Sequence, residues 1–212
     1  IGTDNCDIVL NELDALANID FVTRTEKDEH RTLEIVRVGT CGGMQEDIPL
    51  GTFLVSEKSI GWDGVLAFYE GRDEIADLGF EDALVDFIHY PAKAARPYVV
   101  AANPELVNRI AGDDMMRGCT IAANGFYGPQ GRVLRCDLAV KDINERITDF
   151  RYEGQRITNY EMEGSAIAGL SLLMGHKAMT VCCVIAQRKV EAANTDYKPR
   201  IKQLVQTVLE RI

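Results

Sequence analysis

Apolar residues occur along the chain in runs that differ in length and spacing. Residues 178–186 form an unbroken apolar run without alternation, which is typical of a strand covered on both faces. Shorter apolar runs at residues 33–38, 52–56 and 119–123 predict three more strands. The first of these leads into the glycines at positions 39, 42 and 43, and the third leads into a glycine-rich turn at 124–131.

Other segments repeat their apolar residues every three or four positions, which predicts helices. Residues 4–19 are expected to form a helix capped by Thr3 or Asp4. Residues 160–174 are expected to form another, with Gly175 just past its end. Asn103 is expected to cap a short helix through Ile110. The apolar positions of the first helix are Ile8, Leu10, Leu13 and Leu16. A last helix is predicted near the end of the chain, with apolar positions Ile201, Leu204, Val205, Val208, Leu209 and Ile212.

The alternation of strands and helices predicts an α/β fold built around one sheet. Residues 60–97 mix glycine, aspartate and aromatic residues, and their pattern predicts no order of elements. The chain has no internal repeat, low-complexity tract or linker that would divide it, so we expect one domain over residues 1–212.

Composition narrows the class of protein. Of 212 residues, 46% are hydrophobic and 26% are charged, which excludes a disordered chain or a fibre. The net charge of −10 argues against non-specific nucleic-acid binding but permits a small pocket for an anion. No apolar run approaches the roughly 20 residues that span a bilayer, and the first residues resemble no signal peptide. We therefore expect a cytoplasmic protein without a membrane partner.

The six cysteines show no Cys-x-x-Cys pair, and only three histidines are present. This spacing fits neither a zinc site nor a disulfide framework. We expect reduced, mostly buried thiols and no metal.

A first candidate for chemistry is residues 37–43. A strand that leaves the sheet into three glycines would expose backbone N–H groups to an anion, and Arg37 and the Thr40 hydroxyl would add donors. A tight turn without a ligand explains the same glycines equally simply.

A second candidate is residues 160–164, where Glu161 and Glu163 flank Met162. An ionised carboxylate only accepts hydrogen bonds, and it therefore suits the paired hydroxyls of a ribose. Acidic residues in a first helical turn, which favour the helix dipole, are the alternative.

A third candidate is the turn that carries Phe126, Gln130 and Arg132. An aromatic face beside an amide and a guanidinium suits a planar heterocycle, because a side-chain amide both donates and accepts. An exposed loop with incidental polar residues is the alternative.

Together and in this order, these segments resemble the nucleoside phosphorylase family, and most closely its uridine phosphorylases. Arg-Val-Gly-Thr-x-Gly at 37–42 resembles the phosphate and ribose loop, and Phe-x-x-x-Gln-x-Arg at 126–132 resembles the uracil-reading loop. Asn-Tyr-Glu-Met-Glu at 159–163 resembles the ribose motif, and Val-Ile-Ala-Gln-Arg at 184–188 resembles the strand end that closes the base pocket. The likeness covers nearly the whole chain.

The resemblance implies a single domain with a central mixed, twisted sheet flanked by helices. It implies a pentosyltransferase of pyrimidine salvage that converts uridine and phosphate to uracil and ribose 1-phosphate, with inorganic phosphate as co-substrate and no cofactor. The implied phosphate ligands are Arg37 and Thr40. The implied ribose ligands are Thr40, Glu161, Met162 and Glu163. The implied base ligands are Gly42, Phe126, Gln130, Arg132, Ile185 and Arg188. Arg37, Thr40, Gln130 and Arg132 are the implied catalytic residues.

The preference for a pyrimidine or a purine base is inferred from residues 185–187. Purine-cleaving relatives place an aspartate near positions 185–187, and here the residues are Ile185, Ala186 and Gln187. A pyrimidine is therefore favoured over a purine. A purine phosphorylase, a nucleosidase that uses water in place of phosphate, and a non-catalytic nucleoside-binding module remain open alternatives.

The resemblance also implies parts that this sequence does not contain. Uridine phosphorylases carry an earlier Gly-Asp-Pro loop with a phosphate-binding Arg, and a His or Arg loop that reaches a neighbouring subunit. We expect about 80 residues, roughly the first third of the domain, to be missing, together with the first strands of the sheet. The resemblance further implies a homo-oligomer, either a dimer or a hexamer.

Overall fold

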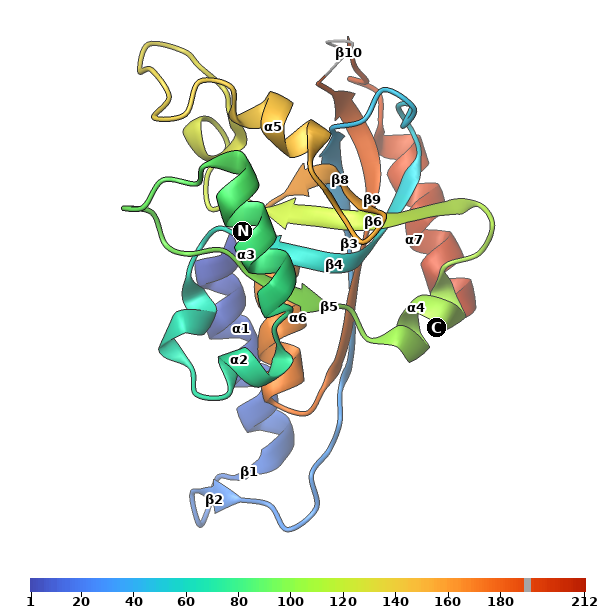
Figure 1. The fold of residues 1–212 in the computed structure, drawn as a ribbon. Coiled ribbons are helices and arrows are strands. Elements are labelled where there is room, and N and C mark those ends of the chain that lie inside the picture. Colours follow the sequence, from blue (N-terminus) through green and yellow to red (C-terminus); the bar gives the residue numbers. More distant parts are fainter. Residues whose placement is uncertain (189–191) are drawn as a thin grey trace.

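The fold centres on a mixed, twisted β-sheet that is flanked by helices (Figure 1). The computed structural model describes residues 1–188 and 192–212. The strand order is β10-β9-β3-β8-β6-β4-β5, and β4 also pairs with β9, so five of the strands close into a ring. The α/β fold expected from the sequence is confirmed.

The strands of the sheet are β3 (Glu34–Gly43), β4 (Phe53–Gly61), β5 (Tyr98–Ala101), β6 (Met115–Ala122), β8 (Gln155–Glu161), β9 (Lys177–Gln187) and β10 (Ala192–Ala193). β3 is parallel to β9, and β6 is parallel to both β4 and β8. β7 (Arg151–Tyr152) forms a hairpin with β8. The four strands expected from apolar runs all exist, and each extends beyond its run at one end or both.

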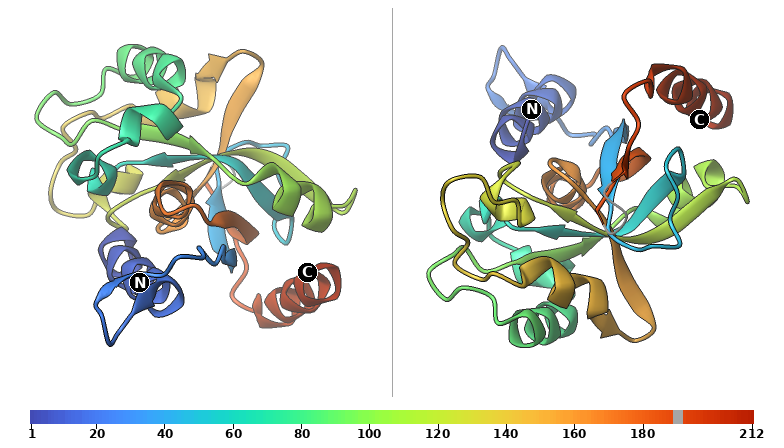
Figure 2. Two further views of the ribbon diagram at one scale, coloured as in Figure 1. Left: turned by 90° about the horizontal axis from the view of Figure 1, so that it is seen from below. Right: turned by 90° about the horizontal axis from the view of Figure 1, so that it is seen from above.

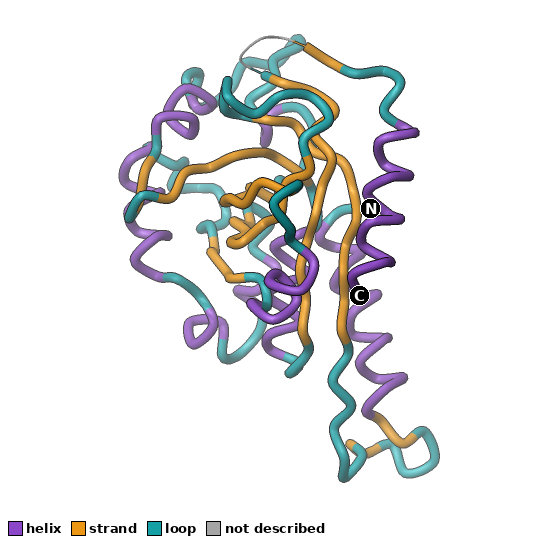
Figure 3. The backbone as a smooth tube through the Cα atoms, turned by 90° about the vertical axis from the view of Figure 1, so that its right-hand side faces the viewer, coloured by secondary structure: helices purple, strands orange, loops and turns teal. Residues whose placement is uncertain are grey.

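The helices are α1 (Thr3–Asn18), α2 (Arg72–Ile75), α3 (Leu78–Ile88), α4 (Pro104–Ile110), α5 (Ile143–Asp149), α6 (Gly164–Leu173) and α7 (Lys198–Arg211). Two short 3₁₀ turns are η1 (Val65–Phe68) and η2 (Gly128–Gln130). Helices lie on opposite sides of the strands (Figure 2). α1 packs along α6, and it leads into the small hairpin of β1 (Ile19–Asp20) and β2 (Thr25–Glu26), which projects from the body (Figure 3).

Alternation along β9 explains how this buried strand packs against helices. Met179, Val181 and Cys183 join one apolar cluster with residues of α4 and α7, including Leu106 and Leu204. Side chains alternate across a strand, so the residues between them face the other way. The continuous apolar run of this segment therefore serves two packing surfaces, as the sequence predicted.

The residues predicted to begin and end the helices were partly correct. Asn103 caps α4 by accepting a hydrogen bond from the Leu106 N–H at 3.1 Å, and Gly175 follows α6 with a φ of 74°. α1 differs from its prediction, because Gly2 occupies the cap position and makes no side-chain cap.

The apolar face predicted for the first helix was also wrong. Leu10 is buried, but Ile8, Leu13 and Leu16 are exposed, and Cys6 completes the buried side instead. The last helix is similar, since Leu204 and Val208 are buried while Val205, Leu209 and Ile212 are exposed. In both helices, the rest of the described chain covers only part of the apolar stripe that the sequence pattern predicts.

The largest error concerns residues 160–174. Tyr160 does not open a helix but lies near the end of β8, where it pairs with Ile121 of β6 and Gly42 of β3. The preceding Ile157 and Thr158 are β-branched and fully buried, which suits a strand inside the sheet. The helix begins only at Gly164, so the two glutamates occupy a strand-to-helix junction.

Candidate active site

A cavity of about 450 Å³ opens where β3, β8 and β9 approach the 124–132 turn. Ten of the residues selected from the sequence line it: Arg37, Thr40, Gly42, Phe126, Gln130, Arg132, Glu161, Met162, Glu163 and Ile185. Arg188 joins them through Gln130, whose backbone oxygen it contacts at 2.9 Å. Four segments that are distant in sequence thus meet in one cavity.

Arg37 lies at the centre of a buried cluster of charges. Its Nη1 atom stands 3.1 Å from Glu161 Oε2, and its Nη2 atom pairs with Glu163. Nη1 also donates to the Cys182 sulfur at 3.1 Å. The guanidinium is therefore held from three directions by residues of β8, the β8–α6 junction and β9.

The two glutamates differ in their surroundings. The Glu161 side chain is fully buried, and its carboxylate accepts hydrogen bonds from the backbone N–H groups of Glu163 and Gly164 at 2.8–3.0 Å. These N–H groups lie at the start of α6, where a helix favours negative charge. Glu163 faces the cavity and also accepts from the Ile1 ammonium at 2.8 Å. Glu161 thus anchors the cluster, whereas Glu163 is placed to meet a ligand.

The electrostatics of the cluster follow from burial and pairing. Burial raises the pKa of Glu161, although Arg37 and the two N–H groups oppose that shift. Burial also disfavours ionisation of Glu163, but the Ile1 ammonium and Arg37 outweigh it and lower the pKa of this carboxyl. A hydrogen bond from Cys41, together with Arg37, lowers the pKa of the Cys182 thiol. No sequence motif marks Cys182, because its contact with Arg37 depends on the register of β9 beside β3.

The glycines of residues 39–43 do not form the loop expected from the sequence. They belong to β3, which pairs with β9 along its whole length and with β8 at Gly42 and Gly43. A Cβ on Gly39 would stand 2.8–2.9 Å from the Arg37 guanidinium. This glycine therefore makes room for a side chain, and the prediction of a glycine loop was wrong.

The turn at 124–132 presents hydrogen-bond donors. Gln130 is buried, and its Oε1 atom accepts from Arg132 Nη1 at 2.6 Å and from Arg188 Nη2 at 2.7 Å. With the amide oxygen engaged twice, its nitrogen is the end left for a ligand. Burial, reinforced by the neighbouring Arg132, lowers the pKa of Arg188 to about 10. One amide and two guanidinium groups thus form an edge that consists of donors.

Phe126 and Tyr160 frame this edge. The Arg132 guanidinium lies 3.8 Å from the centre of the Phe126 ring, so one face of that ring is already covered. Arg188 lies over Tyr160 at 4.8 Å. Tyr160 lines the cavity and was not selected from the sequence, because it was expected to start a helix.

Asn144 is a second residue that sequence reasoning missed. From α5 its amide nitrogen donates to the backbone oxygens of Gln130 and Gly131 at 3.3 Å, and its oxygen accepts from the Tyr160 hydroxyl at 3.2 Å. It therefore ties the donor-bearing turn to β8. No motif marks this residue, because it acts from outside the cavity.

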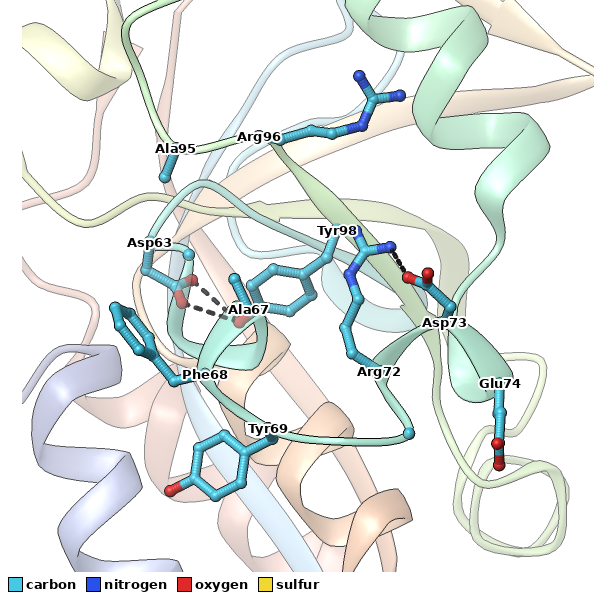
Figure 4. A pocket seen from close by; sticks show the side chains of 12 residues that line it. Asp63, Ala67, Phe68, Tyr69, Arg72, Asp73, Glu74, Ala95, Arg96 and Tyr98 are labelled. Atoms are coloured by element: carbon cyan, nitrogen blue, oxygen red, sulfur yellow. Dashed lines mark hydrogen bonds and ion pairs between the residues drawn. The ribbon is translucent and has the colours of Figure 1, made fainter.

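A larger cavity of about 810 Å³ lies elsewhere, around Asp63, Arg72 and Tyr98 (Figure 4). Several of its polar groups already bind one another: Asp63 accepts from the Tyr98 hydroxyl at 3.0 Å, and Arg72 pairs with Asp73 at 2.6 Å. None of the residues selected from the sequence lines it. Size alone therefore does not make it the better candidate.

Asp14, His30 and His176 bring possible metal-ligand atoms within 4.8 Å of one another. However, the backbone N–H of Leu33 donates to His176 Nδ1 at 3.2 Å, so Nε2 carries the proton of the neutral ring. A histidine that binds a metal through Nε2 normally keeps its proton on Nδ1. This arrangement speaks against a metal at that position.

Five of the six cysteines are buried, as expected, and Cys136 is exposed. Across residues 1–188 and 192–212, no helix combines the length and the apolar character needed to cross a membrane.

The fold and the cavity define a class of α/β protein whose site combines a partly buried arginine, paired carboxylates and a donor-rich turn. A model of the phosphorylase superfamily matches residues 1–211, and the chain belongs to that family. It is 28% identical over 161 residues to uridine phosphorylase A of Schistosoma mansoni, covering 72% of this chain and 47% of that protein. It is 24% identical over 155 residues to the uridine phosphorylase of Thermococcus kodakarensis, covering 72% and 48%.

A solved structure extends the comparison. The nucleoside phosphorylase of Trypanosoma brucei, described as showing uridine phosphorylase activity, superposes with a TM-score of 0.82 and 25% identity. That match covers 100% of this chain and 77% of the other. The chain spans about half the length of the curated relatives it matches.

Proposed function

We propose that this protein cleaves a pyrimidine nucleoside, preferably uridine, with inorganic phosphate, yielding uracil and ribose 1-phosphate. The observation that carries the proposal is the shared cavity of Arg37, Glu163 and Gln130. These are the three groups needed to hold an anion, a sugar diol and a base side by side. The uridine phosphorylases among the relatives support the same assignment.

The reaction needs charge stabilisation at both ends of the breaking bond. A phosphate oxygen attacks the anomeric carbon while the C–N bond to the base breaks, leaving positive charge on the sugar and negative charge on the pyrimidine. Arg37 and Thr40 would hold phosphate beside the sugar, and Gln130 and Arg132 would stabilise the departing base. Holding both reactants in one cavity supplies proximity.

The sugar would lie between these two ends. Glu163 lines the cavity and would accept the 2′- and 3′-hydroxyls in place of the Ile1 ammonium and the Gly2 N–H, which donate to its Oε1 atom in this structure; Met162 would lie beside the ring. Glu161 is engaged by Arg37 and by the start of α6, and we assign it the role of holding Arg37 in place.

The donor edge sets the choice of base. The O2 and O4 carbonyl oxygens of uracil match the amide nitrogen of Gln130 and the guanidinium groups of Arg132 and Arg188. Its N3–H needs an acceptor, which Gln130 Oε1 would supply by exchanging one of its two arginine donors. Cytosine and adenine present amino groups, which would leave donors facing donors. Each such mismatch is worth about 1–3 kcal/mol, so we expect cytidine to react roughly 10- to 100-fold more slowly than uridine.

A substrate panel tests this proposal. Uridine, thymidine, cytidine, inosine and adenosine are each incubated with and without phosphate, and free base is measured. We expect phosphate-dependent release of uracil. Cleavage without phosphate would indicate a nucleosidase, inosine cleavage a purine phosphorylase, and uridine binding without turnover a binding module.

Two further expectations belong to the same proposal and stay predictions. They are a homo-oligomer whose subunits complete one another's sites and a cytoplasmic location. Sedimentation of the complete protein addresses the first of these.

A further inference from the structure

Three buried side chains from separate segments meet at the first turn of α6. The Tyr98 hydroxyl, from β5, lies 3.0 Å from both carboxylate oxygens of Asp63 (Figure 4) and 3.0 Å from Ser165 Oγ. Ser165 Oγ in turn lies 3.1 Å from Asp63 Oδ2. Tyr98 and Ser165 are 1% and 0% exposed. We refer to Asp63, Tyr98 and Ser165 as the Asp63 cluster.

Asp63 is the acceptor that organises this cluster. Its carboxylate accepts from the backbone N–H of Val65 at 2.8 Å, as well as from the Tyr98 and Ser165 hydroxyls. Burial raises the pKa of this carboxyl, and the three donors oppose that shift. All three donors are neutral groups. A carboxylate that is largely removed from water depends on such donors, so it fixes the orientation of both hydroxyls.

Gly61 makes room for the Tyr98 ring. The two residues are paired across β4 and β5, and a Cβ on Gly61 would stand 2.1–2.6 Å from atoms of the Tyr98 side chain. The ring therefore lies against the backbone of β4, and its hydroxyl reaches the start of α6 from there. The position of the hydroxyl is thus set by two paired strands and not by a loop.

Ser165 directly follows the two residues whose backbone N–H groups hold Glu161. The N–H groups of Glu163 and Gly164 donate to the Glu161 carboxylate at 2.8–3.0 Å. Glu161 Oε2 lies 3.1 Å from Arg37 Nη1. A shift of the first turn of α6 therefore moves the carboxylate that holds the guanidinium.

We propose that Asp63 and Tyr98 are positioning residues for the reaction: they fix Ser165 and the first turn of α6, and thereby hold Glu161 and Arg37 in the arrangement that binds phosphate. Neither Asp63 nor Tyr98 lines the candidate active site, so both act through α6. The role rests on the proposed function, because phosphate binding by Arg37 belongs to that proposal. Small displacements of a group that orients a reactant are costly to catalysis.

Amide hydrogen exchange tests the positioning of α6 without any substrate. Tyr98→Phe keeps the ring and removes the hydroxyl, and exchange at the N–H groups of Glu163 and Gly164, followed by NMR, is expected to become about fivefold faster. Tyr69→Phe is the matched control. The Tyr69 hydroxyl also donates to a carboxylate, that of Asp7, but Asp7 belongs to α1 and not to α6. This variant should leave exchange at both N–H groups unchanged.

Phosphate saturation curves test the consequence for the reaction. Tyr98→Phe is expected to raise the KM for phosphate about fivefold, and Tyr69→Phe is expected to leave it unchanged. Both substitutions should lower the urea midpoint to a similar extent, because each removes a hydroxyl that donates to a carboxylate. A role in stability alone would therefore affect the two variants alike, whereas a positioning role separates them.

Ser165→Ala breaks the same link from the side of α6, and it serves as the second variant should Tyr98→Phe fail to fold. It should also raise the KM for phosphate about fivefold, and the double variant should be no worse than the more affected single variant, because both changes remove one link. Fully additive effects in the double variant would contradict a shared link.

An unchanged KM for phosphate in Tyr98→Phe, or an equal rise in Tyr69→Phe, would overturn the positioning role. Faster amide exchange in Tyr98→Phe, combined with no turnover of uridine by the unmodified protein, would retain the positioning of α6 and reject the proposed reaction. Phosphate-dependent turnover of uridine, combined with unchanged exchange in Tyr98→Phe, would do the opposite.

Discussion

Gly39 shows how a missing side chain positions a charged one. Its Cα lies beneath the Arg37 guanidinium, whose Nη1 atom would be 2.8 Å from an added Cβ. Arg37 has no easy alternative position, because Glu161, Glu163 and Cys182 hold it on other sides. Glycine inside a strand often marks such a close approach.

Gly39→Ala is therefore expected to displace Arg37 and to raise the KM for phosphate about tenfold, equivalent to about 1.4 kcal/mol. Gly42→Ala is the comparison, because its Cβ would meet no atom closer than 3.8 Å. Phosphate saturation curves for both variants check this. An equal effect of the two substitutions would show that Arg37 does not depend on the space above Gly39.

Substitutions of Asn144 test whether its side-chain amide positions the turn that carries Gln130. Its amide nitrogen donates to the turn that carries Gln130, so Asn144→Ala is expected to raise the KM for uridine about tenfold and to alter kcat less. Asn144→Asp keeps the shape but loses the donor, and it should share the defect. The KM for phosphate is measured alongside, and a parallel rise in it would indicate general unfolding of the site.

At the scale of elements, the junction between β8 and α6 decides how the glutamates act. The sequence selected both glutamates, which line the cavity, but it predicted a helix from Tyr160, because the alanines and leucines that follow extend the helical pattern. Sheet pairing with β6 overrides that local preference. Consequently Glu161 lies at the end of a strand and faces the start of α6, which a sequence without strand register does not reveal.

The same junction predicts different outcomes for two similar substitutions. Glu161→Gln removes a carboxylate whose pKa burial raises, so it is expected to change the free energy of unfolding at neutral pH by less than about 1 kcal/mol. Glu163→Gln removes a carboxylate whose pKa the Ile1 ammonium and Arg37 lower, so it should cost about 2 kcal/mol and weaken nucleoside binding strongly. Urea unfolding and uridine titration distinguish the two. A reversed order of stability would refute the assigned roles.

At the scale of the whole molecule, the sequence predicted which residues line the cavity better than it predicted how the fold brings them together. Arg37, Gln130 and Glu163 were identifiable because their side-chain chemistry is specific. Cys182, Tyr160 and Asn144 were not, because each matters only through a neighbour that the fold supplies. The closure of five strands into a ring is likewise invisible in local periodicity, since the pairing of β4 with β9 joins residues far apart in the chain.

A buried histidine makes the stability of the folded chain depend on pH. His176 follows α6 and is 4% exposed, and its Nδ1 atom accepts the Leu33 N–H at the start of β3. Burial lowers its pKa below the ordinary value of 6.5, although Asp14 at 3.1 Å opposes that shift. Below pH 6.5 the unfolded chain therefore binds a proton that the native chain does not. The free energy of unfolding consequently falls as the pH drops below that value.

His176→Asn keeps an acceptor for Leu33 but cannot titrate, so its stability should depend less steeply on pH between 6.5 and 5. Urea unfolding at several pH values measures the slope. His89→Asn, at the exposed end of α3, is the matched control: no described contact joins His89 to His176, and this variant should retain the steeper slope of the unmodified chain. If His176→Asn and the unmodified chain lose stability in parallel, the acid sensitivity arises elsewhere, and the link between α6 and β3 is not its source.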